Sequence, residues 1–344
     1  MSEPDTQIPV EGSTTLEPVL EVRNLVTYLY TRWGTTRAVD GVSLELFPGE
    51  MLGIVGESGS GKSMLALSLV RLTPEPASRI LDGEVILNGR DLLSLSEKQM
   101  RKVRGKEISM ILQDPQQSLN PVFSVGDQLA EALRVHDRSA SDGEVHDRSV
   151  QALQEVRVSA PERRMRNFPH QMSGGMKQRI VGAMAMAYRP QVLIADEPTT
   201  ALDVTIQAQY LRLLEDLRKE TGVGMILITH DFGVVAESCD RVAVMYGGRI
   251  VEQAPVEEVF DNPRHPYTRA LLAARPRAGR STGRLPSIEG QPPSLSDLPE
   301  GCRFASRCPY VVETCTSEYP PEFEIGPNHR SACWRAEEEP WANR

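Results

Sequence analysis

Short runs of apolar residues alternate along the chain with segments of helical periodicity. The continuous apolar runs at Met51–Val55, 192–195 and 225–228 have the character of strands buried on both faces of a parallel sheet. Apolar residues at helical spacing follow the first run after Lys62, and they recur in residues 206–217. Strands and helices that alternate in this way predict an α/β fold with a parallel sheet.

Before the first buried run, the pattern is that of half-buried strands. From Val19 onward apolar residues alternate with polar ones, and a second strand is expected at residues 42–47, before a turn at Pro48 and Gly49. Residues 83–89 carry strand-forming side chains that lead into an Asn-Gly pair, which is a strong hairpin signal. We therefore expect an antiparallel β subdomain on the N-terminal side of the core.

Polar segments divide the chain further. Residues 1–18 are rich in Ser, Glu, Pro and Thr and predict a disordered lead. Residues from about 114 to 178 are polar with spaced apolar positions, which predicts a helical insertion. Within it the pentapeptide Val-His-Asp-Arg-Ser starts at Val135 and again at Val145, and we interpret it as a solvent-exposed loop. Frequent prolines from residue 262 separate a main body, 19–261, from a small, irregular C-terminal extension, 262–344.

Charge and the distribution of apolar residues restrict the function classes. A formal net charge of −9 argues against a broad basic face, so we expect no nucleic-acid partner. No run approaches the roughly 20 apolar residues of a membrane-spanning helix, and the N-terminal residues lack the pattern of a secretory signal. Contact with a membrane is therefore expected only from the cytosolic side, through a partner.

A glycine-rich segment between a predicted strand and a predicted helix carries the first chemical signal. Residues 56–63 fit the pattern Gly-x4-Gly-Lys-Ser/Thr. The glycines let backbone N–H groups surround phosphates, and the helix N-terminus adds a positive dipole end. Lys62 would reach the β- and γ-phosphates, and the Ser63 hydroxyl would bind Mg²⁺. The expected ATP-binding residues of this loop are Gly56, Glu57, Ser58, Gly59, Ser60, Gly61, Lys62 and Ser63.

Two carboxylates follow the second buried run. Asp196 can hold Mg²⁺, and Glu197 can orient the attacking water or accept its proton. An Asp-Glu pair after a strand can also be a helix cap. Together with the upstream phosphate loop, however, the pair predicts a hydrolytic site.

A second Ser/Gly-rich helix start predicts a two-subunit arrangement. Ser173, Gly174 and Gly175 precede residues of helical periodicity and offer another anion-binding helix N-terminus. One triphosphate does not need two such sites in one chain. We therefore expect this N-terminus to cover the γ-phosphate of ATP bound to another subunit.

These motifs resemble those of ABC transporter ATPases from Val19 to about residue 261. The resemblance implies that Gln113 senses the γ-phosphate and Mg²⁺, that Ala201-Leu202-Asp203 crosses the dimer seam, and that His230 is the switch histidine. Ser173-Gly174-Gly175 matches the family signature, although Met172 and Met176 replace the commoner Leu and Gln. For the aromatic residue that stacks on adenine, strict alignment falls on Leu29 between Tyr28 and Tyr30, and we favour Tyr30.

Further sequence segments resemble those of the peptide and nickel importer branch of that family. They comprise residues 111–115 with 118–121, residues 168–176, and the octet His-Pro-Tyr-Thr-Arg-Ala-Leu-Leu at 265–272. The resemblance implies an ATPase at the cytoplasmic face of the cell membrane that powers uptake of di- or oligopeptides. It also implies three kinds of partner: a second ATPase subunit, two transmembrane permease subunits and an extracytoplasmic peptide-binding protein.

Alternatives to peptide import remain open. A nickel chelate or glutathione could be the cargo. A soluble, non-transport ABC ATPase would be expected to show a coiled-coil insertion or two cassettes, neither of which occurs in the sequence. A scaffold that binds ATP without turnover is disfavoured by the presence of both Glu197 and His230.

Four of the five cysteines lie close together near the end of the chain: Cys302, Cys308, Cys315 and Cys333. Clustered cysteines in a chain without a secretory signal favour a metal site over disulfides. Their spacing matches neither zinc knuckles nor the common ferredoxins, so zinc, iron–sulfur and unligated thiols are equally open from spacing alone. The family resemblance implies a [4Fe–4S] cluster, with Zn²⁺ as the alternative and His329 as a weaker ligand candidate.

Overall fold

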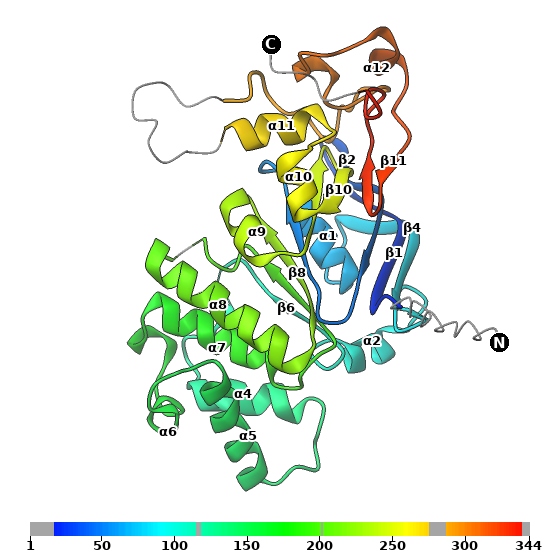
Figure 1. Ribbon diagram of the computed structural model, residues 1–344. Helices are drawn as coiled ribbons and strands as arrows, with labels where there is room; N and C mark the ends of the chain where they lie inside the picture. The colour runs from blue at the N-terminus through cyan, green and yellow to red at the C-terminus, as the bar shows by residue number, and fades with distance from the viewer. Residues whose placement is uncertain (1–16, 115–117, 201, 275–286, 339–344) are drawn as a thin grey trace, which may run out of the picture.

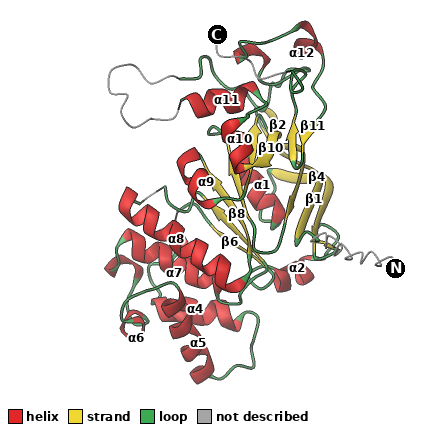
Figure 2. Cartoon of the chain, in the orientation of Figure 1, coloured by secondary structure: helices red, strands yellow, loops and turns green. Residues whose placement is uncertain are grey.

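The computed structural model describes residues 17–114, 118–200, 202–274 and 287–338, arranged as two sheets with surrounding helices (Figure 1; Figure 2). Only the last two residues of the expected N-terminal lead fall within these ranges. Ala201 and Pro115, which belong to two of the family-like motifs, lie outside them. In the described part of the chain, no helix is long and apolar enough to cross a bilayer.

Four strands form the antiparallel sheet expected on the N-terminal side, in the order β2-β1-β4-β5. Their bounds are β1 (Leu20–Thr31), β2 (Gly34–Leu46), β4 (Ser78–Leu87) and β5 (Arg90–Asp91). The predicted hairpin is confirmed, since Leu87 pairs with Arg90 across Asn88 and Gly89. Both turn residues have positive φ, as a type I′ turn requires. β2 starts earlier than the expected residues 42–47, because pairing with β1 extends it through polar positions.

Eight strands form the second sheet, in the order β11-β12-β10-β9-β3-β8-β7-β6. They are β3 (Met51–Val55), β6 (Ile108–Ile111), β7 (Val192–Asp196), β8 (Gly224–Thr229), β9 (Arg241–Tyr246), β10 (Arg249–Pro255), β11 (Phe323–Gly326) and β12 (His329–Ser331). The strands from β9 to β6 are parallel. The three apolar runs predicted as buried strands are β3, β7 and β8, and every residue in them is buried. The predicted α/β fold is therefore confirmed.

Helices cover this sheet and extend beyond it (Figure 1). They are α1 (Lys62–Leu69), α2 (Glu97–Val103), α4 (Val125–Arg134), α5 (Asp142–Glu155), α6 (Pro161–Arg164), η1 (Pro169–Gln171), α7 (Gly174–Met186), α8 (Val204–Thr221), α9 (Phe232–Ser238), α10 (Val256–Asp261), α11 (Pro266–Ala273), η2 (Ala305–Arg307) and α12 (Glu313–Ser317). α4 to α7 lie at one end of the molecule, and α11 and α12 lie at the other. The predicted helices of the polar insertion are present, and its spaced apolar residues Leu129, Leu133, Leu153 and Val156 are buried.

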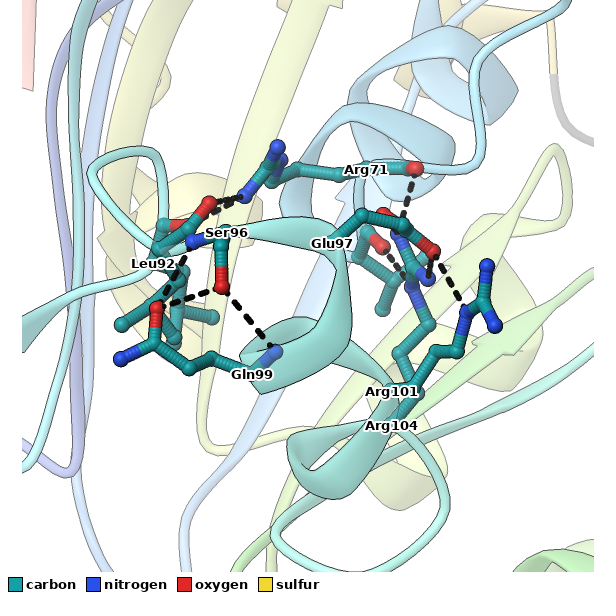
Figure 3. Close-up of polar contacts among 9 residues, drawn as sticks. Arg71, Leu92, Ser96, Glu97, Gln99, Arg101 and Arg104 are labelled. Carbon is teal, nitrogen blue, oxygen red and sulfur yellow. Dashed lines mark hydrogen bonds and ion pairs between the residues drawn. The ribbon is translucent and has the colours of Figure 1, made fainter.

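The C-terminal end of α1 is braced by side chains from the α2 region (Figure 3). Arg104 donates hydrogen bonds to the carbonyl oxygens of Val70 and Arg71, at 2.7 and 2.8 Å. Carbonyls at a helix C-terminus have no partner within the helix, so these bonds satisfy groups that would otherwise be orphaned. Glu97 in turn accepts a hydrogen bond of 2.7 Å from Arg104. The helix that follows the phosphate loop is therefore fixed at its far end.

The repeated pentapeptide adopts two different structures. Val135 follows α4 and is 58% exposed, but Val145 lies inside α5 and is buried. The interpretation of both copies as solvent-exposed loop is therefore wrong for the second copy. Ser141 and Glu144 form a capping box that starts α5 just before Val145, and this local signal decides the structure.

The C-terminal extension is built into the main sheet. β12 pairs with β10, and β11 pairs with β12. Phe304 is fully buried and packs against Tyr246 and Tyr267, with ring centroids 5.4 Å away in both cases. The extension therefore packs against the core of the main body.

Candidate functional site

Four predicted site segments meet because they follow neighbouring parallel strands. The phosphate loop follows β3, Gln113 follows β6, Asp196 ends β7, and His230 follows β8. These strands are adjacent in the order β3-β8-β7-β6. In open α/β sheets, ligands bind outside the carboxyl ends of the strands. The topology therefore brings the predicted residues to one edge of the sheet.

The phosphate loop winds closely around the Lys62 side chain. The Lys62 ammonium donates to the carbonyl oxygens of Gly56, at 2.8 Å, and Glu57, at 2.9 Å. Burial lowers the pKa of Lys62, and the nearby carboxylates of Glu197, Asp196 and Glu57 oppose that shift. A cation held among carbonyl oxygens in this way is available to anionic oxygen atoms that enter the loop.

Two glycines allow the loop to approach neighbouring strands. A Cβ atom at Gly56 would lie 2.1 Å from the carbonyl oxygen of Met245, and one at Gly61 would lie 2.1 Å from that of Ala38. Gly61 is the N-cap of α1 and, having no side chain, leaves the first amides of the helix uncapped. Uncapped amides at a helix N-terminus form an anion-binding position.

Asp196 is a buried carboxylate with unused hydrogen-bonding capacity. Burial raises its pKa, and the Ser63 hydroxyl nearby lowers it. Its Oδ1 atom is buried and has no hydrogen-bond partner among the described residues. An orphaned carboxylate oxygen close to a hydroxyl fits a hard divalent cation with oxygen ligands. Asp196 and Ser63, with Gln113 close by, therefore fit Mg²⁺.

Glu197 is the centre of the polar cluster. Its Oε2 atom accepts hydrogen bonds from Gln113 Nε2, at 3.0 Å, and from the Thr200 hydroxyl, at 2.9 Å. Its Oε1 atom lies 3.5 Å from Nδ1 of His230, whose side chain is 62% exposed. Glu197 also has a left-handed backbone, with φ of 44°, which is uncommon for a residue with a side chain and is found at functional sites. The structure thus joins Gln113, Glu197 and His230, and it adds Thr200.

The two tyrosines considered for adenine stacking differ in their environment. Tyr28 donates a 2.6 Å hydrogen bond to Asp40, whereas the Tyr30 side chain is 44% exposed. The Arg79 guanidinium lies 5.8 Å from the centre of the Tyr30 ring. Tyr30 is therefore the more exposed of the two tyrosines.

The Ser/Gly-rich start of α7 lies in the helical part of the molecule. α7 packs against α4, α5 and α8 rather than against α1. Ser173 caps α7 by accepting from Met176 N–H, and Asp203 caps α8 by accepting from Ile206 N–H. A Cβ atom at Gly174 would meet nothing closer than 3.9 Å, whereas one at Gly175 would lie 2.7 Å from Ile206. Gly175 is thus required for packing against α8, and Gly174 is not.

The four late cysteines line one small cavity, together with His265, Phe304 and Trp334 among others. Cys315 and Cys333 are buried, and Cys302 and Cys308 are partly buried. Burial raises the pKa of Cys302 to about 11 and that of Cys333 to about 12. No three His, Cys, Asp or Glu side chains in the described ranges are arranged to hold a single metal ion. His329 instead bonds to Glu252.

Sequence reasoning missed some polar contacts of the site. Thr200 carries no motif of its own, although its position three residues after Glu197 offered a weak signal. The contacts that Tyr267 and Arg307 make with Glu57 join residues more than 200 positions apart. No local pattern could indicate them.

Comparisons with known proteins indicate the family of the chain. Residues 39–200 match the ABC transporter family, and residues 251–315 match the oligopeptide/dipeptide transporter C-terminal region. A probable peptide ABC transporter ATP-binding protein of Sinorhizobium fredii is 54% identical over 93% of this chain and 96% of its own length. The dipeptide transport ATP-binding protein of Bacillus subtilis is 46% identical over 93% of this chain and 95% of its own.

Among solved structures, the ATP-binding cassette MJ0796 in a dimeric post-hydrolysis state with ADP and phosphate is similar, at 26% identity and a TM-score of 0.62. The match covers 69% of this chain and 98% of the cassette. The chain therefore belongs to the ATP-binding subunits of the ABC transporter family, in the group that carries the oligopeptide/dipeptide transporter C-terminal region.

Proposed function

We propose that this ABC ATPase powers uptake of di- or oligopeptides across the cell membrane. The carrying observation is the combination of a hydrolytic cluster around Glu197 with the C-terminal region typical of oligopeptide and dipeptide transporters. The relatives named for peptide or dipeptide transport match along nearly their whole length. In this proposal residues 19–261 form the ATPase domain, with the helical insertion at about 114–178, and residues 262–344 form the extension.

We assign a role to each residue of the proposed ATP site. Lys62 and the backbone amides of residues 56–63 bind the β- and γ-phosphates, and Tyr30 stacks on adenine. Ser63, Asp196 and Gln113 would hold Mg²⁺, which neutralises phosphate charge when bound.

In the hydrolytic step, Glu197 orients the attacking water or accepts its proton. His230 contacts the γ-phosphate, and Gln113 and Thr200 hold the Glu197 carboxylate in place.

The proposed cycle needs a second ATPase subunit. Ser173, Gly174, Gly175 and Asp203 lie on the helical side of the molecule, where they can cover ATP bound to a facing subunit. Closure and reopening of that sandwich would drive two transmembrane permease subunits, which receive cargo from an extracytoplasmic peptide-binding protein. The chain would therefore act at the cytoplasmic face of the membrane, as a peripheral subunit.

We propose that the four late cysteines hold a [4Fe–4S] cluster, although their side chains are not arranged around a single metal ion. All four thiols line one small cavity, and four thiolates are the donor set that such a cluster requires. Cys302, Cys308, Cys315 and Cys333 would be the ligands, as thiolates that are costly to bury without a cation. Zinc remains the alternative.

The transport proposal is tested with the assembled transporter in lipid vesicles. Peptides should stimulate ATP hydrolysis and should accumulate in the vesicles in an ATP-dependent manner. With the Glu197→Gln variant, neither stimulation nor accumulation should occur. Stimulation by a nickel chelate or by glutathione, and not by any peptide, would replace the cargo assignment. ATP hydrolysis that no solute and no permease alters would contradict the transport role.

The cluster proposal is tested on protein purified without oxygen. The protein should be brown and contain iron and acid-labile sulfide, and replacing any of the four late cysteines by Ser should bleach it. Replacing Cys239, a partly buried residue outside the cavity, is the matched control and should leave the colour. Colourless protein with stoichiometric zinc would contradict the cluster.

A further inference from the structure

Glu57, the second residue of the phosphate loop, is held by the C-terminal extension at both its backbone and its side chain. Its backbone N–H donates a 2.8 Å hydrogen bond to the Tyr267 hydroxyl. Its carboxylate forms a two-pronged ion pair with Arg307, with N–O distances of 2.6 and 3.0 Å. Paired bonds of this kind fix orientation as well as supplying attraction. The loop is therefore held in place by residues outside the main body, 19–261.

Arg307 is a buried cation whose other donors are also occupied. Its side chain is only 2% exposed, whereas that of Glu57 is 27% exposed. Nε of Arg307 donates to the carbonyl oxygen of Glu289 at 3.0 Å, and one terminal nitrogen lies 3.3 Å from the Tyr246 hydroxyl. A buried guanidinium with a full set of partners has little freedom to move. The position of Glu57 therefore follows the position of Arg307.

Arg307 lies in the short turn between two of the four cysteines. Ala305 N–H donates to the carbonyl oxygen of Cys302, and Cys308 N–H donates to that of Ala305. Both cysteines line the four-thiol cavity. Arg307 is adjacent to Cys308 in this turn. A change in the positions of the cysteines should therefore change the position of Arg307.

Tyr267 gives a structural reason for the octet at residues 265–272. The buried Glu252 carboxylate accepts from the backbone N–H of His265, at 3.0 Å, and bonds to His329, at 2.9 Å. These bonds fix the start of α11, and Tyr267 in its first turn reaches the phosphate loop. The octet thus provides the second half of the clamp on Glu57.

We propose that Arg307 is a positioning residue that couples the four-cysteine site to ATP binding at the phosphate loop. Arg307 neutralises the Glu57 carboxylate, which would otherwise repel phosphates, and it holds the loop amides in position for them. By linkage, whatever orders the cysteine site raises nucleotide affinity, and nucleotide binding stabilises the cysteine site by the same factor. The proposal rests on the proposed role of residues 56–63 as the nucleotide loop.

The first test is a double-mutant cycle in nucleotide affinity on the full-length chain. A fluorescent, non-hydrolysable ATP analogue is titrated against wild type, Arg307→Ala, Glu57→Gln and the double variant. Arg307→Ala should weaken binding about 5- to 50-fold, within the usual span of coupling between sites. In the Glu57→Gln background the same change should add little, because the repelling carboxylate is already gone.

Controls separate this effect from general damage. Arg330→Ala removes another arginine of the extension, whose carboxylate partners Glu322 and Glu324 are also in the extension, and it should bind like wild type. Arg307→Lys keeps a buried cation but cannot form the two-pronged ion pair with Glu57. Its loss of nucleotide affinity should lie between those of wild type and Arg307→Ala. Wild-type affinity in Arg307→Ala, or an equal loss in the Glu57→Gln background, would overturn the proposal. If wild type binds no better than Lys62→Ala, the proposed function itself fails.

The second test addresses the cysteines. Cys302→Ser and Cys308→Ser should weaken nucleotide binding by an amount similar to Arg307→Ala, and this loss should shrink in the Glu57→Gln background. Thermal unfolding and metal content are measured on the same samples. A variant that loses its bound metal and still binds nucleotide as the wild type does would contradict the proposal. That result would show that the cysteine site and the phosphate loop are independent.

Discussion

The N-termini of α1 and α7 both follow Ser/Gly-rich segments, but their surroundings differ. The start of α1 is uncapped and lies beside Lys62, Asp196 and the Glu197 cluster. The start of α7 is capped by Ser173, and a Cβ atom added at Gly174 would meet only Leu202, at 3.9 Å. In our proposal, the start of α1 carries the groups that hydrolyse ATP, and the start of α7 only binds the γ-phosphate of a facing subunit. The difference suggests two complementary halves of one site, supplied by different subunits.

The largest effect is expected at the first helix start. Glu197→Gln keeps the size of the side chain and an oxygen that can accept from Gln113 or Thr200, but it cannot take a proton. Turnover should fall by about 10²- to 10⁴-fold, the usual contribution of a general base. Steady-state ATP hydrolysis measures the fall, and ATP affinity serves as the control. Near-normal turnover would remove Glu197 from the hydrolytic role.

A substitution at the start of α7 should lower turnover without changing the affinity of the same chain for ATP. Gly174→Asp adds a carboxylate where there is space for it, so the fold should hold while the charge repels a facing γ-phosphate. In the assembled transporter hydrolysis should drop about 10-fold or more, which corresponds to about 1.4 kcal/mol. In the isolated subunit, the Kd for ATP should match that of wild type. A large loss of affinity there would mean that α7 serves the ATP of its own chain.

The two glycines of α7 sharpen the comparison further. Gly175→Ala places a Cβ atom 2.7 Å from Ile206, whereas Gly174→Ala has no contact under 3.9 Å. Overpacking of this kind costs about 1–3 kcal/mol, so Gly175→Ala should lower the unfolding midpoint in denaturant and Gly174→Ala should not. Equal midpoints would show that α7 and α8 are not packed as described.

The smallest effect is expected at the far end of α1. Arg104→Ala removes the hydrogen bonds to Val70 and Arg71 and leaves those carbonyls to water. Hydrogen bonds from charged groups contribute about 1.5–3 kcal/mol, so the Tm should fall by a few degrees while ATP affinity changes little. A loss of affinity as large as that expected for Arg307→Ala would mean that both ends of α1 control the loop.

Much of the core could be predicted from the sequence, because its signals are local. β3, β7 and β8 are continuous apolar runs, and the residues after them meet because parallel strands end at one edge. The second copy of the repeated pentapeptide was misjudged, because the capping box at Ser141 decides its structure. The clamp on Glu57 was not predictable, because Arg307 is 250 residues away and only tertiary packing joins them.

We propose that α7 of one subunit completes the ATP site of another. Sedimentation velocity of the Glu197→Gln chain, alone and mixed with the second ATPase subunit of its transporter, tests this directly. With ATP and Mg²⁺ a two-subunit species should form, it should be absent without ATP, and Gly174→Asp in this chain should reduce its amount. A chain that binds ATP yet remains a single subunit in both samples would contradict the account.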